Sequence, residues 1–370
     1  MRVAITGAGG FFGRHLRVRL YAAGLHEIVA IDRAAFLHPT SLAKAVADVD
    51  AVVHLAGVNR GEAHVVESQN ALLATQLVSA LDTTSSTAFL VFANTIHAGA
   101  DTPYGRGKQR ACEILETWAA RRGSALVNVV FHNLFGEGGR PNYNSFVATF
   151  CDLLSVGGQP EIETDRPLEL IHAQEAALTI QDVLASDAPP KSATLLTHGV
   201  VTTVSEVRAR LTAIADCYTD GTFPDLGDRF TRQLFNTYRS FLFPERYPLP
   251  LLPKEDHRGM FVEAVRSGGG KSQVSYSTTA AGVTRGNHFH LEKVERFLVL
   301  KGRARIAIRP VFGTDVHGFD VSGDQPSVID IPTLHTHNIT NVGSGDLYTL
   351  FWTDEIYDPT NADTFMEPVA

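Results

Sequence analysis

Four side chains near the C-terminal end have the residue types and the spacing of a metal-binding set. His288 and His290 lie two apart in a stretch with strand character, so their side chains point to the same face. Glu295 follows a few residues later, and His337 lies on a later predicted strand. Three imidazole nitrogens and one carboxylate oxygen suit zinc or a similar divalent ion, and a catalytic zinc site commonly keeps one coordination position open.

The spacing around these residues resembles the two motifs of the cupin family. Written out, it is Gly282-x5-His288-x-His290-x4-Glu295-x6-Gly302, followed by Pro332-x4-His337-x3-Asn341. One position departs from the pattern, because Leu334 stands where cupins usually have glycine. Three alternatives stay open: histidines that only line the wet face of a barrel strand, a metal-free cupin that uses them as acid–base groups, and His335 in place of His337 as the fourth ligand.

Tyr104 and Lys108 form a second set of candidate catalytic groups, four apart on a predicted helix and therefore on one face. A lysine ammonium on the same face stabilises a phenolate and lowers the tyrosine pKa from its ordinary value of about 10. Thr95 ends the preceding predicted strand, and its hydroxyl could polarise a substrate carbonyl. Taken alone, a Tyr-x-x-x-Lys pair is more often a chance surface pair than an active site.

A glycine-rich turn at the N-terminus lies between a predicted strand and a predicted helix. Gly7, Gly10 and Gly13 permit a tight turn and let backbone N–H groups approach a pyrophosphate at the helix N-terminus. An ordinary left-handed turn is the alternative, and the position directly after the first strand favours nucleotide binding.

The end of the second predicted strand bears on the choice of cofactor. Asp32 would hold adenosine ribose hydroxyls and favours NAD, whereas Arg33 can hold a 2′-phosphate and favours NADP. Arg14 offers a second guanidinium, and arginine–phosphate contacts are strong, so we favour NADPH and keep NAD open. A surface ion pair between Asp32 and Arg33 is the simpler alternative.

The composition limits the class of protein and its partners. The chain has 370 residues, 44% hydrophobic and 19% charged, which suits a globular protein of two domains. Its net charge is -8 and no basic run stands out, so we expect neither nucleic acid nor membrane as a partner. Cys112, Cys151 and Cys217 are scattered and imply no disulfide framework. No signal peptide or long apolar stretch is evident, so we expect a cytoplasmic protein.

The elements that would position these groups fall into two parts. In the first, apolar strands alternate with helices, which predicts an α/β domain with a Rossmann-type doubly wound parallel sheet. In the second, short strand-like runs separated by Gly, Pro, Asn and Asp predict an all-β jelly-roll barrel. The proline-rich stretch ERYPLPLLPKED separates them, so we expect one domain over residues 1–247 and another over residues 248–370.

The first part resembles the short-chain dehydrogenase/reductase superfamily of the extended type. The segments GAGGFFG, HLAG and PYGRGK, with Asn70 and Thr95, occur in the order and at the spacings of that superfamily. The resemblance implies hydride transfer between a nicotinamide and an alcohol or ketone. Tyr104 would be the proton donor or acceptor, Lys108 would bind the nicotinamide ribose, Thr95 would orient the carbonyl, and Asn70 would hold a helix bend and a proton-relay water. The implied cofactor contacts are Gly7, Gly10, Phe11, Phe12, Gly13, Asp32, Arg33, Leu55, Ala56, Gly57, Tyr104 and Lys108.

A further segment resembles extended reductases that act on nucleotide sugars. Asn133-Leu-Phe-Gly136 matches their N-x-[YF]-G pattern, although Val130 stands where these enzymes usually have arginine. The polar stretch that follows has residues favoured in turns, so a substrate role and plain turn chemistry both stay open. The candidate substrate contacts are Arg60, Asn133, Asn142, Tyr143 and Asn144.

An extended reductase joined to a cupin resembles the CapF-type capsular polysaccharide enzymes over nearly the whole chain. The strings HLAGVNR, PNYNSFVATFC, DHRGMFVEAV, TRGNHFH and DEIYDPTNADTF carry the likeness. It implies a zinc-containing homodimer whose cupin epimerises C3 of a UDP-2-acetamido-2,6-dideoxy-4-keto-hexose. The reductase would then reduce C4 with NADPH to UDP-N-acetyl-6-deoxy-L-talosamine, on the route to UDP-N-acetyl-L-fucosamine.

Three other functions fit parts of the same pattern. A monofunctional 4-keto reductase could carry the cupin only for dimerisation or regulation. A non-enzymatic sensor could combine a cofactor-binding scaffold with a ligand-binding cupin, although intact Thr95, Tyr104 and Lys108 argue against it. A different 4-keto sugar could be the substrate, as Val130 and Leu334 allow. The residues leave open whether the metal is catalytic or structural, and which groups move the C3 proton.

Overall fold

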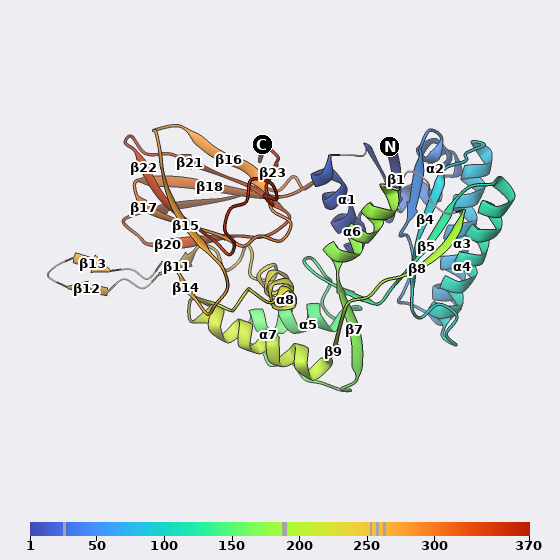
Figure 1. Ribbon diagram of the computed structural model, residues 1–370, viewed down its shortest axis with the longest axis horizontal. Helices are drawn as coiled ribbons and strands as arrows, with labels where there is room; N and C mark the ends of the chain where they lie inside the picture. Colours follow the sequence, from blue (N-terminus) through green and yellow to red (C-terminus); the bar gives the residue numbers. More distant parts are fainter. Residues whose placement is uncertain (25–26, 187–190, 252–253, 257–258, 262–263) are drawn as a thin grey trace. The chain divides into compact units, whose positions relative to one another are not determined.

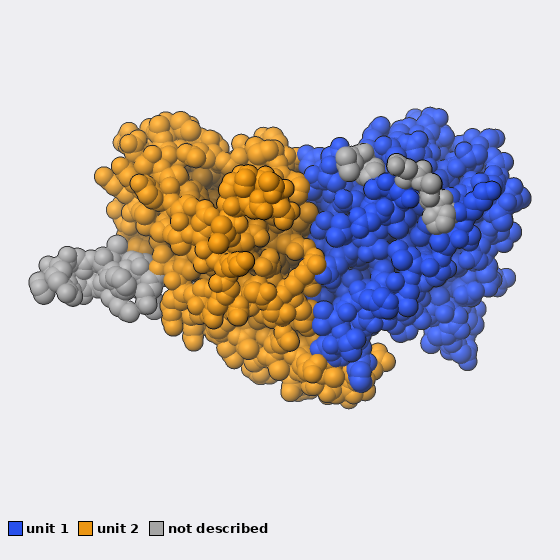
Figure 2. Space-filling model, viewed as in Figure 1, with its two compact units in different colours: residues 1–135, 167–202 blue, residues 136–166, 203–370 orange. Residues whose placement is uncertain are grey.

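The computed structural model (Figure 1) describes residues 1–24, 27–186, 191–251, 254–256, 259–261 and 264–370. The chain forms two compact units, which Figure 2 colours separately. The first contains Met1–Phe135 and Pro167–Thr202, and the second contains Gly136–Arg166 and Thr203–Ala370. None of the helices in this described part is long and apolar enough to cross a membrane.

The first unit is built on a six-stranded parallel sheet with helices on both faces (Figure 1). The strand order is β2-β1-β3-β4-β5-β8. The order changes direction between β1 and β3, which is the position where open sheets of this kind bind their ligands. The strands are β1 (Arg2–Thr6), β2 (Glu27–Ile31), β3 (Ala51–His54), β4 (Phe89–Thr95), β5 (Leu126–Phe131) and β8 (Ser192–Leu196).

Successive residues of these strands enter two separate cores, because side chains along a strand point alternately to opposite faces. Val3 and Ile5 share a core with residues of α1 and α6, whereas Ala4 shares one with residues of α2, α3 and α4. The helices are α1 (Phe11–Ala23), α2 (Pro39–Val46), α3 (Ala63–Thr83), α4 (Pro103–Arg122) and α6 (Ala173–Leu184), with a 3-10 helix at Ala34–Leu37. A small separate sheet has the order β6 (Asn133–Phe135), β7 (Pro167–His172), β9 (Val200–Thr203).

The second unit contains two antiparallel five-stranded sheets that form the walls of a cupin-like jelly roll (Figure 1). One has the order β11-β20-β17-β22-β15 and the other β19-β18-β21-β16-β23. The strands are β11 (Leu249–Pro250), β15 (Gln273–Thr279), β16 (Thr284–Phe289), β17 (Glu295–Lys301), β18 (Arg303–Pro310), β19 (His317–Ser322), β20 (Ser327–Ile331), β21 (His335–Asn341), β22 (Leu347–Thr353) and β23 (Phe365–Met366). Two short pairs are β10 (Thr222–Phe223) with β14 (Arg266–Ser267), and β12 (Lys254–Asp256) with β13 (Gly259–Phe261). The parallel sheet and this jelly roll confirm the predicted fold class.

Three helices belong to the same unit as the barrel: α5 (Phe146–Ser155), α7 (Val204–Thr219) and α8 (Arg229–Arg239). Phe223, shortly after α7, stacks on Trp352 of β22 with ring centroids 4.2 Å apart. The hydroxyl of Tyr218 on α7 donates to the buried carboxylate of Asp330 on β20, which also pairs with Arg296 of β17. The domain boundary expected near residue 248 is placed from the order of the sequence motifs, and it stays a prediction. The two compact units are defined by packing instead.

Candidate functional site

The glycine turn lies at the switch point of the parallel sheet. Gly7 follows β1 with a φ of 69°, and a Cβ there would lie 2.9 Å from the backbone nitrogen of Ala56, in the loop after β3. A Cβ on Gly13 would lie 2.2 Å from the carbonyl oxygen of Gly7. Glycine therefore lets the turn, the β3 loop and the start of α1 approach closely, and the backbone forms a cradle at the N-terminus of α1.

Other residues predicted to bind the cofactor lie at the start of α1 and after β2. The ring of Phe12 packs against Phe131 with centroids 5.3 Å apart. Asp32 accepts the N–H of Ala35 at 3.0 Å, and Arg33 beside it is exposed. The first turn of α1 contains Phe11, Phe12 and Gly13.

Two buried polar residues that were not among the predicted site residues support this cradle. Oγ1 of Thr6 accepts the N–H groups of Leu55 and Ala56, both at 3.2 Å, and lies 2.8 Å from Nδ1 of His54. With both oxygen lone pairs used, the Thr6 hydroxyl donates to His54. Burial, and then the charge of Lys108, lower the His54 pKa to about 3, so the ring stays neutral. His54 is the first residue of the HLAG segment, whereas the only sequence signal for Thr6 was a polar residue at the end of an apolar strand.

Asn70 ties α3 to the loop after β3. Its Nδ2 donates to the carbonyl oxygens of Val58 and Val66, both at 2.7 Å, and its Oδ1 accepts the Val58 N–H at 3.2 Å. A Cβ on Gly57 would lie 2.9 Å from that oxygen. Because both amide donors are used, the Asn70 side chain holds the loop after β3 against α3. Its proton-relay role stays a prediction.

The three residues expected to carry out reduction come from β4 and α4. Thr95 ends β4, and Tyr104 and Lys108 lie in the first two turns of α4. The Lys108 ammonium donates to the carbonyl oxygen of Ala93, two residues before Thr95, at 2.6 Å, and lies 4.0 Å from the centre of the Phe92 ring. Burial lowers the pKa of Lys108 to about 7. The ammonium is thus fixed beside the carboxyl end of β4.

The pKa of Tyr104 shifts opposite to the expected direction. Burial raises it, and no hydrogen bond or ion pair joins Tyr104 to Lys108 within the described residues. The expectation that Lys108 lowers this pKa is therefore wrong for the chain alone, because desolvation of the phenol dominates.

The candidate substrate residues are distributed over both units. In the first, Nδ2 of Asn133 donates to the backbone oxygen of Glu169 at 3.4 Å. In the second, Asn142 has a φ of 53° and its N–H donates to a hydroxyl oxygen of α5 at 2.9 Å, which is turn chemistry. Arg60 and Asn133 belong to the first unit, and Asn142, Tyr143 and Asn144 to the second.

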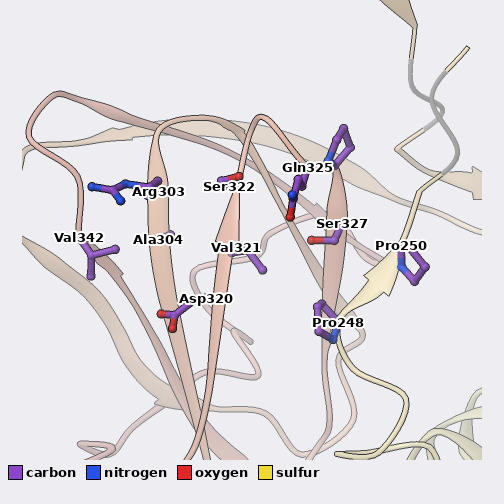
Figure 3. Close-up of a pocket in the computed structure, with 11 residues that line it drawn as sticks. Pro248, Pro250, Arg303, Ala304, Asp320, Val321, Ser322, Gln325, Ser327 and Val342 are labelled. Atoms are coloured by element: carbon purple, nitrogen blue, oxygen red, sulfur yellow. The ribbon is translucent and has the colours of Figure 1, made fainter. Parts of the chain in front are cut away.

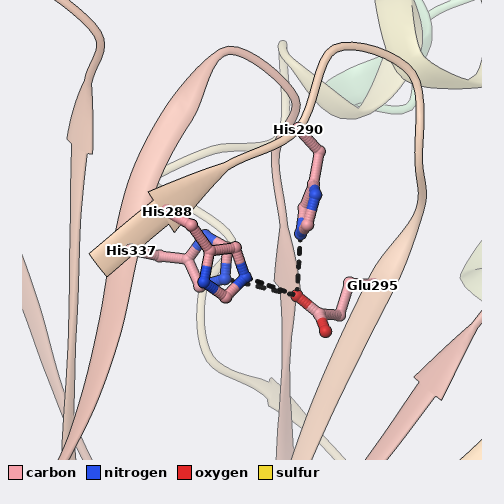
Figure 4. Close-up of side chains that lie close together, drawn as sticks. All are labelled: His288, His290, Glu295 and His337. Atoms are coloured by element: carbon pink, nitrogen blue, oxygen red, sulfur yellow. Dashed lines mark hydrogen bonds and ion pairs between the residues drawn. The ribbon is translucent and has the colours of Figure 1, made fainter. Parts of the chain in front are cut away.

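His288, His290, Glu295 and His337 converge in the barrel, and Figure 4 shows the three imidazoles around the carboxylate. Their ligand atoms all lie within 4.8 Å of one another. From Oε2 of Glu295, Nε2 of His290, His337 and His288 lie at 3.0, 3.2 and 4.0 Å. Ligands roughly 2.0–2.2 Å from a tetrahedral ion are about 3.3–3.6 Å apart, so small shifts would suit zinc.

A β-bulge aligns two of these side chains. The pairing of β16 with β21 shifts register between Gly286 and His288, and the intervening Asn287 has a φ of 62°. The shift places His288 opposite His337, with ring centroids 4.4 Å apart. A bulge re-aims the side chain that follows it, and here it brings two imidazoles to one point.

The hydrogen bonds of His290 test whether the cluster suits a cation. Its Nδ1 contacts the carbonyl oxygen of Asp363, which can only accept, so Nδ1 carries a proton. In the neutral ring, Nε2 then presents a lone pair to Oε2 of Glu295 at 3.0 Å. The two lone pairs repel unless the ring is protonated or a cation lies between them. Both nitrogens of buried His337 also lack a hydrogen bond among the described residues, so the donor set fits a divalent ion.

The surroundings of His288, His337 and Glu295 hold these three groups in protonation states suited to metal binding. Burial first, and then the neighbouring His337, lower the pKa of His288 to about 3, and burial also lowers the pKa of His337. Burial raises the pKa of Glu295, but the neighbouring imidazoles of His290 and His337 outweigh it and hold that pKa well below its usual value. Neutral imidazoles and an ionised carboxylate are the forms that bind metals.

His335, the alternative ligand, lies outside this cluster. Its Nδ1 donates to the carbonyl oxygen of Thr333 at 2.8 Å. Its neighbour Leu334 has a φ of 63°, the left-handed region that suits the glycine of cupins, and its N–H donates to the carbonyl oxygen of His290 at 2.8 Å. The turn therefore keeps the left-handed backbone conformation without glycine, and its N–H holds the backbone of the proposed ligand His290.

A groove of about 650 Å³ opens elsewhere on the barrel, at the ends of β11, β18, β19 and β20 (Figure 3). Prolines, Arg303 and Asp320 are among the residues that line it. It contains none of the candidate catalytic or metal-binding residues, so no chemistry is assigned to it.

Comparison with known proteins matches both parts of the chain. Residues 3–177 match the NAD dependent epimerase/dehydratase family, and residues 254–365 match the polysaccharide biosynthesis C-terminal domain. A protein from Pseudomonas aeruginosa, described as UDP-2-acetamido-2,6-beta-L-arabino-hexul-4-ose reductase, is 31% identical over 99% of this chain and 98% of its own length.

Solved structures show the same relationship. The capsular polysaccharide assembling protein CapF from Staphylococcus aureus covers 100% of both chains at 30% identity and a TM-score of 0.63. A UDP-N-acetylglucosamine 4-epimerase from Bacillus cereus, at 22% identity and a TM-score of 0.52, covers 58% of this chain and 82% of its own, and shares the fold. The fold and the site define a nicotinamide-dependent extended short-chain reductase joined to a cupin-like barrel. The chain belongs to the family of CapF-type capsular polysaccharide biosynthesis enzymes.

Proposed function

We propose that the chain is a bifunctional UDP-sugar enzyme of capsule or surface polysaccharide biosynthesis. The barrel would epimerise C3 of a UDP-2-acetamido-2,6-dideoxy-4-keto-hexose. The first unit would reduce its C4 ketone with NADPH to UDP-N-acetyl-6-deoxy-L-talosamine. The observation that carries the proposal is that one chain holds two sets of groups. Thr95, Tyr104 and Lys108 lie at the end of β4 and the start of α4, in the parallel sheet that also carries the glycine turn, and four potential metal ligands converge in a barrel. The full-length likeness to a UDP-sugar reductase supports the substrate class.

In the reduction, bound NADPH would supply the hydride. Tyr104 would donate its phenolic proton to the C4 oxygen, and its raised pKa keeps that proton in place at neutral pH. Thr95 would hydrogen-bond the same oxygen and fix the ketone. Lys108, held by the carbonyl of Ala93, would bind the nicotinamide ribose.

We propose NADPH rather than NADH because Arg14 and Arg33 could share a 2′-phosphate. Comparing kcat/KM for the two cofactors in wild type and Arg33→Ala tests this. We expect kcat/KM to fall only with NADPH. An equal fall with both cofactors would show that Arg33 does not bind the 2′-phosphate.

In the epimerisation, the C3 proton is acidic because C4 is a ketone. A divalent ion, zinc first, would be held by His288, His290, Glu295 and His337, and would stabilise the enolate oxygen. The chain itself contributes a donor set arranged before binding, with His290 oriented by Asp363. A purely structural ion is the alternative role.

The test is incubation of the protein with the 4-keto sugar in heavy water, first without NADPH and then with it. Mass spectrometry and proton NMR at C3 follow exchange and reduction. Deuterium at C3 before NADPH, and a reduced deoxysugar after it, is the expected result. Tyr104→Phe should keep the exchange and lose the reduction, whereas Glu295→Gln should lose the exchange.

A monofunctional reductase with a structural barrel is the second candidate. The side chains of His290 and His337 are only 1% and 0% exposed, which restricts the approach of a sugar and favours this view. Clean reduction without exchange would establish it. Neither signal would point to another sugar or to a sensor.

We also propose that the protein is a homodimer. Light scattering on the purified protein tests this, and a mass equal to one chain at micromolar concentration would contradict it.

A further inference from the structure

His132, Glu169 and His198 form another group of potential metal ligands, in the first unit and separate from the barrel cluster. Nε2 of His132 lies 3.3 Å from Oε2 of Glu169, and Nδ1 of His198 lies 3.6 Å from Oε1 of the same carboxylate. One ligand atom from each residue lies within 4.8 Å of the other two. The three residues are far apart along the chain and belong to no motif.

Neighbouring strands bring these side chains together. His132 directly follows β5, Glu169 lies in β7, and His198 follows β8, the parallel neighbour of β5. The carboxyl ends of parallel strands meet at the edge of the sheet where ligands bind. Phe131, the residue before His132, pairs with Thr95 of β4, so the group lies on the same edge as the proposed reduction centre.

The loop that carries His198 is built tightly against β7. The N–H of Gly199 donates to Oε1 of Glu169. A Cβ on Gly199 would lie 2.2 Å from the carbonyl oxygen of Leu170, so glycine is required for this approach. The contact fixes the carboxylate between the two imidazoles.

We propose that His132, Glu169 and His198 bind a divalent transition-metal ion, with zinc as the first candidate. Two imidazoles and one carboxylate are a ligand set of catalytic zinc and of iron(II) sites. Ligands roughly 2.0–2.2 Å from a tetrahedral ion are about 3.3–3.6 Å apart. Each imidazole nitrogen lies at such a distance, 3.3 or 3.6 Å, from its nearer oxygen of the Glu169 carboxylate. The His198 side chain is 75% exposed, so the remaining coordination position is open to water or to an oxygen of a bound ligand.

A plain ion pair between Glu169 and a protonated histidine would use the same atoms and would bind no metal. The chain offers a matched pair for comparison. Nδ1 of His64 lies 3.6 Å from Oε2 of Glu62, but both side chains are about four-fifths exposed, at 78% and 80%. No third ligand joins them in the part of the chain that the structure describes.

The experiment is a Co²⁺ titration of the full-length protein after treatment with a chelator. Visible absorption reports the coordination, and elemental analysis after desalting reports the bound equivalents. We expect His198→Ala and Glu169→Gln to bind about one equivalent less than wild type, and His64→Ala to bind as wild type does. Circular dichroism checks that each variant is folded.

Equal metal content and affinity in wild type, His198→Ala and Glu169→Gln would overturn the proposal. An equal loss in His64→Ala would also overturn it, because it would indicate adventitious surface binding. The variants leave the barrel cluster unchanged, so a difference in metal content between them and wild type tests the proposed site whatever the barrel cluster binds. Since no sugar or nicotinamide is needed, the outcome is independent of the proposed enzymatic function.

Discussion

The carbonyl oxygen of Asp363 accepts a hydrogen bond from Nδ1 of His290, and the carboxylate of the same Asp363 accepts three backbone N–H groups from the loop that follows His290. These belong to Leu291, Glu292 and Lys293, at 2.9, 2.7 and 2.7 Å. A single residue of the C-terminal tail therefore fixes both the tautomer of a proposed metal ligand and the path of its loop.

Asp363→Ala should weaken metal binding by the barrel about 10–100-fold, because three backbone N–H groups in the loop after His290 lose the carboxylate that accepts their hydrogen bonds. Competition with a chromophoric chelator measures the affinity. Asp358→Ala is the matched control, since this exposed carboxylate of the same tail caps only its own turn at Thr360. Wild-type affinity in both variants would show that Asp363 does not position the ligand.

Lys108 should make the stability of the fold depend on pH. Burial lowers its pKa from 10.5 to about 7, so between these values the unfolded chain binds a proton that the folded chain does not. The free energy of unfolding should therefore rise with pH in this window, by at most about 1.4 kcal/mol per pH unit. Urea unfolding from about pH 7 to 9 measures it. Lys108→Met should flatten the rise and the exposed Lys44→Met should not; equal slopes in all three proteins would contradict a buried ammonium.

Arg296→Met should destabilise the second unit by about 3–5 kcal/mol, because it leaves the buried Asp330 carboxylate without its guanidinium. The double variant Arg296→Met/Asp330→Leu should cost less, since the carboxylate that Arg296 pairs with is removed as well. Denaturant unfolding measures both. The exposed pair of Arg305 and Asp320, 3.3 Å apart, is the control, and Arg305→Met should change stability by under about 1 kcal/mol. A similar small effect at Arg296 would refute the importance of the buried pair.

Leu334→Gly should leave the barrel as stable as wild type or more so, because glycine adopts the observed φ of 63° without steric cost. Leu334→Val should lose about 1–2 kcal/mol, since a β-branched side chain is strained in this region. Thermal unfolding of the two variants separates them. If valine were tolerated better than glycine, side-chain packing rather than backbone strain would control this turn.

Much of the fold and of both proposed centres could be predicted from the sequence because local rules govern them. A strand followed by Gly7, with Gly13 in the next helix, indicates a tight turn whatever surrounds it. The four-residue step from Tyr104 to Lys108 places them on one helix face by geometry alone. The direction of the Tyr104 pKa shift could not be predicted, because burial depends on the packing around it.

The sequence by itself determined which residues are candidates for the chemistry: the glycine turn, the tyrosine–lysine pair and the four proposed ligands of the barrel. The tertiary structure alone decided three further relationships. The bulge at Asn287 places His288 opposite His337. Asp363 of the C-terminal tail hydrogen-bonds and orients His290. Helix α7 packs against the barrel through the hydrogen bond from Tyr218 to Asp330. It also assembled His132, Glu169 and His198 from three separate segments. Such contacts leave no local pattern, because the packing of whole strands and helices, and not the preferences of neighbouring residues, brings distant segments together.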